Sequence, residues 1–111
     1  MPPGLQGFLS SGGELYLQKG KLERCFAQIE QKFEKGLEYQ ISDALLSEII
    51  GITIEIKDKV GSDTEIFKAN FDLRTKCSAA LSLYMQPGYR EIYIEKLHTI
   101  RPALNYLISL L

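Results

Sequence analysis

Hydrophobic residues between Lys21 and Lys35 recur every three or four positions, with charged residues between them: Leu22, Cys25, Phe26, Ile29 and Phe33. This spacing gathers apolar side chains on one face of an α-helix, and it predicts a helix over the stretch. Gly36 follows directly, where a glycine commonly ends a helix in the left-handed conformation. A second, short helix is predicted to begin at Ser42, a residue type that caps helix N-termini, and to end by Gly51.

From Gly51 to Leu97 hydrophobic residues alternate with polar ones, in four runs within 52–56, 67–73, 81–85 and 92–94. Alternation of period two is typical of strands that bury one face. A two-residue turn at Gly61-Ser62 would pair the first two runs so that all their apolar residues share that face. We therefore predict a four-stranded antiparallel meander. The alternative is that this stretch forms two further helices of an all-α four-helix bundle.

The period changes again near the C-terminus, where hydrophobic residues take helical spacing: Ile100, Ala103, Leu104, Leu107, Ile108 and Leu111. Thr99 is predicted to cap this helix, with Pro102 in its first turn, where a missing amide costs nothing. The resulting fold class is α+β, a two-layer sandwich of N-terminal helices, a four-stranded antiparallel meander and a C-terminal helix. Residues 14–111 would form this single domain, preceded by a flexible N-terminal arm over residues 1–13.

Composition narrows the class of protein. The 111 residues suffice for one domain, and 45% are hydrophobic while 24% are charged. Thirteen basic side chains nearly cancel fourteen acidic ones, which argues against a nucleic-acid partner held by a globally basic surface. No run of about 20 apolar residues could span a membrane as a helix. With no signal peptide and two cysteines, we expect an intracellular protein, cytoplasmic or nuclear.

Residues with catalytic or metal-binding chemistry are sparse. His98 is the single histidine, so one chain cannot form a two-histidine metal site. Cys25 lies on the apolar stripe of the first helix, whereas Cys77 is placed in a loop beside cationic residues. The carboxylate pairs Glu30/Glu34 and Glu91/Glu95 are interpreted as solvated, and no glycine-rich phosphate loop occurs. We therefore predict no enzyme, no cofactor and no metal.

Tyrosine is enriched in protein interfaces because its ring buries area while its hydroxyl stays solvated. In the predicted meander, Tyr84 and Tyr93 are neighbours on the exposed sheet face and Tyr89 is at the adjacent turn. Together with Phe8 and Leu9 of the arm, these residues are the predicted partner-binding site.

The predicted function is a non-catalytic protein–protein interaction module, a small adaptor or complex subunit. It would bind a protein partner, or a second copy as a dimer or other homo-oligomer, through the exposed sheet face or edge and helix surfaces. One alternative is a chaperone-like or regulatory protein that holds an extended peptide. Another is a small-ligand binder or enzyme with a pocket between sheet and helices.

Overall fold

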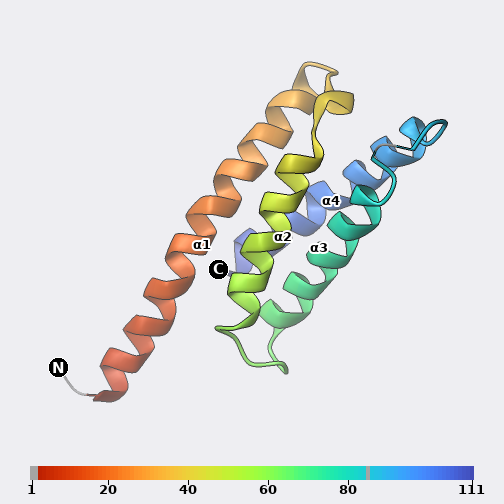
Figure 1. Cartoon of the computed structure of the whole chain (residues 1–111). Coiled ribbons are helices and arrows are strands. Elements are labelled where there is room, and N and C mark those ends of the chain that lie inside the picture. Colours follow the sequence, from red (N-terminus) through yellow and green to blue (C-terminus); the bar gives the residue numbers. More distant parts are fainter. Residues whose placement is uncertain (1–2, 85) are drawn as a thin grey trace.

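A computed structural model describes the backbone of residues 3–84 and 86–111 and the side chains of residues 15–84 and 86–111. Over these ranges the chain forms four α-helices and no strand (Figure 1). The elements are α1 (Pro3–Glu34), a short 3-10 helix η1 (Glu38–Gln40), α2 (Asp43–Lys57), α3 (Glu65–Leu81) and α4 (Arg90–Leu110). The α+β sandwich with its antiparallel meander is therefore wrong, and the alternative all-α fold is the one observed.

Burial along α2 explains why the alternation was misleading. Ile52 and Ile56 are buried, while Ile54 between them is 49% exposed. Residues four apart lie on the same face of a helix, so the buried pair Ile52 and Ile56 fits a helical stripe as well as one face of a strand. β-branched residues have only a weak preference for strands, and packing overrides it here.

Helix α3 repeats the pattern. Ala69 and Leu73 are buried four residues apart, whereas Phe71 is 54% exposed. Asn70, one of the polar residues that alternate with the hydrophobic ones in this run, is 1% exposed and donates from Nδ2 to the Thr53 carbonyl oxygen of α2 at 2.7 Å. The Thr64 side chain caps this helix by accepting a hydrogen bond from the Phe67 amide.

The predicted helix ends were partly correct. Gly36 has a φ of 68°, which confirms it as the left-handed residue after α1. Ser42 occupies the N-cap position of α2, although its side chain makes no capping hydrogen bond. The end predicted at Gly51 is wrong, because α2 continues through it to Lys57. Pro102 lies inside α4 rather than in a first turn, because that helix already begins at Arg90.

The core is a single apolar cluster to which all four helices contribute. Its fully buried large side chains include Leu22, Ile29, Leu46, Ile49, Leu73, Leu97, Ile100 and Leu104. Helix α3 packs extensively against both α2 and α4, whereas α1 makes fewer contacts with α2 and α4. The three later helices therefore form the densest part of the molecule.

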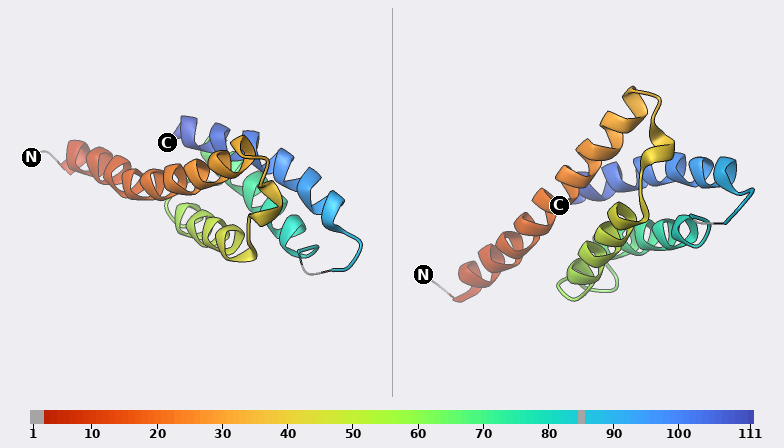
Figure 2. Two further views of the ribbon diagram at one scale, coloured as in Figure 1. Left: turned by 90° about the horizontal axis from the view of Figure 1, so that it is seen from above. Right: turned by 45° about the horizontal axis from the view of Figure 1, so that its top comes forward.

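Helix α1 projects beyond the other helices (Figure 2). Its 32 residues span about 48 Å, against about 22 Å for the 15 residues of α2. The flexibility predicted for the arm over residues 1–13 is a statement about motion, and it stays a prediction. The side chains of Phe8 and Leu9, which were predicted to bind a partner, lie outside the described residues.

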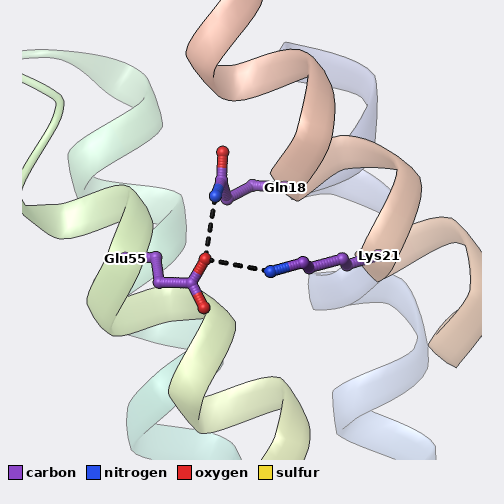
Figure 3. A network of polar contacts seen from close by, with 3 residues as sticks. All are labelled: Gln18, Lys21 and Glu55. Carbon is purple, nitrogen blue, oxygen red and sulfur yellow. Dashed lines mark hydrogen bonds and ion pairs between the residues drawn. The ribbon is translucent and has the colours of Figure 1, made fainter.

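Carboxylates take part in polar contacts that hold α1 against α2 and α4. On α2, Glu55 Oε1 accepts hydrogen bonds from Gln18 Nε2 at 2.8 Å and Lys21 Nζ at 3.3 Å (Figure 3). On α4, Arg101 donates from Nε and Nη2 to the two carboxylate oxygens of Glu30, at 2.7 and 2.8 Å. The hydrogen bond from Arg101 lowers the pKa of Glu30, and the hydrogen bond from Gln18, followed by that from Lys21, lowers the pKa of Glu55.

Candidate functional site

Three tyrosines meet where α3 leads into α4. Tyr84 follows the end of α3, and its ring lies 5.4 Å from that of Tyr93, centroid to centroid, at an interplanar angle of 60°. Tyr39 reaches the same place from η1. Their rings border a surface hollow of about 340 Å³, here called the tyrosine pocket, which is lined by Tyr39, Tyr84, Gln86, Arg90 and Tyr93.

Tyr93 forms the rigid wall of the tyrosine pocket. It is 4% exposed, and its hydroxyl donates to the Ile41 carbonyl oxygen at 2.8 Å. Burial, with smaller contributions from Tyr84 and Asp43, raises the pKa of Tyr93 well above its ordinary value. Through its hydrogen bond to Ile41, the hydroxyl ties α4 to the segment between η1 and α2.

Arg90 supplies the charged wall. Its guanidinium carbon lies 4.5 Å from the centroid of the Tyr39 ring, an arrangement in which the cation is attracted to the ring face. Among the described residues, no carboxylate forms an ion pair with Arg90. A stacked guanidinium keeps its N–H donors directed outward in its own plane, in the fork geometry that matches a carboxylate.

The structure brings two of the sequence-predicted tyrosines together, although for a different reason. Tyr84 and Tyr93 are neighbours because the turn between α3 and α4 joins them, not because strands pair. Tyr93 is buried rather than exposed, so its placement on an open sheet face was wrong. Tyr89 is 42% exposed at the N-cap position of α4 and is not among the residues that line the tyrosine pocket.

Sequence reasoning missed Tyr39 and Arg90. Nothing in the linear spacing relates Tyr39 to the later tyrosines, because the contact depends on how η1 packs beside α4. Arg90 was passed over because the segment around it was interpreted as a strand after a turn. A helix that begins at this position would have placed Arg90 in its first turn, across the connection from Tyr84.

The structure places the candidate catalytic residues outside the lining of the tyrosine pocket. The ring of His98 packs edge-on against Phe33, with centroids 4.8 Å apart. Cys25 and Cys77 are both buried, and burial raises the pKa of each thiol to about 12. The loop placement of Cys77 was wrong, because the residue belongs to the buried face of α3. Glu30, which was interpreted as solvated, is bound by Arg101.

Within residues 15–84 and 86–111, whose side chains the structure describes, no cluster of three or more histidine, cysteine, aspartate or glutamate residues could hold a metal ion. In the same part of the chain, no helix is both long enough and apolar enough to cross a lipid bilayer.

No protein-family model, no curated protein and no solved structure matches this chain.

Proposed function

We propose that the protein is a non-catalytic interaction module, an adaptor or complex subunit, and that a protein partner binds at the tyrosine pocket. The observation that carries the proposal is the combination of three tyrosine rings with an arginine that has no ion-pair partner among the described residues. Tyrosine and arginine are enriched among the few residues that supply most of the binding energy in protein interfaces. An aromatic hollow with a positioned cation is a suitable anchor for one partner side chain.

Rigidity supports the same conclusion. Tyr93 is fixed by its hydrogen bond to Ile41, Tyr84 packs against it, and Arg90 rests on Tyr39. Side chains that are already ordered lose little conformational entropy on binding, so more of the contact energy contributes to affinity. Tyr39 is 43% exposed and has ring area left to bury.

The test compares variants of the tyrosine pocket with a matched pair elsewhere. Arg74 lies over the ring of Phe71 on α3, with its guanidinium carbon 5.4 Å from the centroid, so it forms a second cation–aromatic pair outside the tyrosine pocket. The tagged wild type and the variants Tyr39→Ala, Arg90→Ala, Phe71→Ala and Arg74→Ala would each be incubated with a lysate of the source cells. Captured proteins would be quantified by mass spectrometry.

A partner that is lost with Tyr39→Ala and Arg90→Ala, but kept with Phe71→Ala and Arg74→Ala, is the expected result. Equal melting temperatures among the four variants would show that loss of the partner does not come from unfolding. If both pocket variants capture the same proteins as the wild type, the proposal is wrong.

A small ligand in the same hollow is the second candidate. Its volume of about 340 Å³ is at the lower end of the range of ligand pockets, roughly 300–1,000 Å³. A bound compound seen by native mass spectrometry in the wild type, and absent from Tyr39→Ala, would favour this candidate over a protein partner.

A further inference from the structure

Arg101 is an arginine that stacks on an aromatic ring and also binds a carboxylate. In the tyrosine pocket, Arg90 and its ring form the first of these two contacts without the second. The guanidinium carbon of Arg101 lies 4.1 Å from the centroid of the Phe33 ring. The same guanidinium binds both oxygens of Glu30 through Nε and Nη2, at 2.7 and 2.8 Å. An arginine stacked on an aromatic ring therefore holds a carboxylate at its edge in this protein.

Arg90 repeats the first half of that arrangement on Tyr39, at 4.5 Å. We infer that the partner completes it by placing a carboxylate against the edge of the Arg90 guanidinium, with an apolar or aromatic side chain of the partner on the tyrosine rings. The inference rests on the proposed function and adds the chemistry of the partner. The carboxylate belongs either to an aspartate or glutamate side chain or to a C-terminus.

Charge around the tyrosine pocket restricts the partner to a single anionic group. Asp43 lies close enough to raise the pKa of Tyr93, and Glu91 is in the first turn of α4 beside Arg90. Arg90 is the one cation among the described residues that line the tyrosine pocket. A polyanion such as nucleic acid is held by several cations, whereas one carboxylate can be held by a single guanidinium fork.

The pair of Arg74 and Phe71 is the internal control. Its guanidinium is farther from the ring, at 5.4 Å, and neither residue lines the tyrosine pocket. A carboxylate bound there would meet one aromatic ring instead of the three that border the tyrosine pocket. Because no hollow beside Arg74 is formed by further rings that could hold a second partner side chain, we expect binding at Arg90 and not at Arg74.

Three short peptides serve as probes. N-acetyl-Phe-Glu-amide carries a side-chain carboxylate, N-acetyl-Ala-Phe with a free C-terminus carries a terminal one, and N-acetyl-Phe-Gln-amide is the neutral match of the first. Each would be titrated into the full chain labelled with ¹⁵N and ¹³C. Chemical shifts of the Arg90 and Arg74 side-chain N–H groups and of the Tyr39 ring would be followed.

Saturable shifts at Arg90 and Tyr39, but not at Arg74, are expected with at least one acidic probe. The neutral probe should bind at least about tenfold more weakly, since a hydrogen bond to a charged group contributes about 1.5–3 kcal/mol. The acidic probe with the lower Kd identifies the source of the carboxylate. The variant Arg90→Lys keeps the charge but loses the fork, so it should reduce binding of that probe by a similar factor.

Equal affinity for the acidic and neutral probes, or no shift at Arg90 with any of them, would overturn the inference. Neither result would contradict the proposed function, because dependence of a captured partner on Tyr39 is measured separately. If instead the acidic probes bind as expected while the pocket variants capture the same proteins as the wild type, the carboxylate site is supported and the proposed function as an interaction module is contradicted.

Discussion

Tyr93 links the fold to the tyrosine pocket. Its ring is a wall of the pocket, and its hydroxyl is the donor that satisfies the Ile41 carbonyl oxygen inside the protein. A buried carbonyl oxygen that loses its hydrogen-bond donor has given up its hydrogen bonds to water and gains none inside the protein, which lowers the free energy of unfolding. The position therefore requires tyrosine rather than an aromatic residue in general.

Replacing Tyr93 with phenylalanine should lower the free energy of unfolding by about 1–2 kcal/mol, because the ring remains while the Ile41 oxygen loses its partner. Urea unfolding followed by circular dichroism measures the change. Tyr84→Phe is the matched control, since no hydrogen bond of the Tyr84 hydroxyl is found among the described residues, and it should leave the midpoint unchanged. Equal midpoints for both variants would contradict the role given to Tyr93.

At the scale of elements, Gly51 is an unusual residue for the interior of α2. A Cβ atom added there would meet no heavy atom within 4 Å. Glycine in a helix interior is less stable than alanine because it loses more conformational freedom on folding. Gly51→Ala should therefore raise the free energy of unfolding by about 0.5–1 kcal/mol, measured by thermal or urea unfolding.

Gly36 gives the opposite expectation and serves as the control. Space is also open around it, but its φ of 68° is a conformation that residues with a Cβ adopt at a cost. Gly36→Ala should lower the free energy of unfolding by about 1 kcal/mol. If both alanine variants change stability in the same direction, backbone conformation is not what separates the two sites.

The attachment of α1 should weaken in acid. A carboxyl group whose pKa is lower in the folded protein stabilises the fold above its ordinary pKa, and this contribution is lost as the pH falls through the lowered value. Glu30 and Glu55 both have a pKa below the ordinary value of 4.5. Between pH 6 and pH 3.5 the wild type should therefore lose more stability than the double variant Glu30→Gln with Glu55→Gln.

The difference should be small, up to about 1 kcal/mol, because both ion pairs are partly exposed to solvent. Urea midpoints at the two pH values provide the measurement. Glu34→Gln, which removes an exposed carboxylate from the same helix, should follow the wild type. If the double variant loses as much stability as the wild type, these two carboxylates are not responsible for acid sensitivity.

The helical stripe of residues 21–35 was predictable because its spacing fits one period only, and the stripe near the C-terminus indicated a helix for the same reason. The middle of the chain was not predictable in this way. Ile52, Ile54 and Ile56 satisfy both periods, and only packing decides that Ile54 faces solvent. Asp72 and Lys76 stand four residues apart in the sequence, a spacing that favours a helix, and in α3 they form an ion pair.

The candidate site divides in the same way. Tyr84 and Tyr93 were predictable as neighbours, since any compact connection between their segments brings them close. Tyr39 and Arg90 were not, because their contact joins η1 to α4 across the fold. A single sequence carries no local pattern for a contact of that kind.

At the scale of the whole molecule, the projection of α1 makes the chain elongated. Its principal extents are 57 × 26 × 19 Å and its Cα radius of gyration is 15.4 Å. A compact domain of this length would have a radius of gyration of about 13 Å. The difference reflects the part of α1 that extends past the other helices (Figure 1).

Small-angle X-ray scattering of the monomer should therefore give a radius of gyration close to 15.4 Å rather than about 13 Å. Light scattering on the same sample gives the mass, so a homo-oligomer, which stays a prediction, would be recognised separately. A monomer with a radius near 13 Å would mean that α1 folds back onto the other helices.

The bonds between α1 and α4 join residues far apart in the chain, and they have a kinetic consequence. Arg101 and Glu30 are 71 positions apart, whereas α2, α3 and α4 pack as consecutive helices. Contacts between consecutive helices, those of α1 with α2 included, close short loops and can form early, while the contact between α1 and α4 closes a long loop that costs more entropy. We expect the contact between α1 and α4 to form late, so that loss of the Glu30–Arg101 pair accelerates unfolding and leaves the folding rate nearly unchanged.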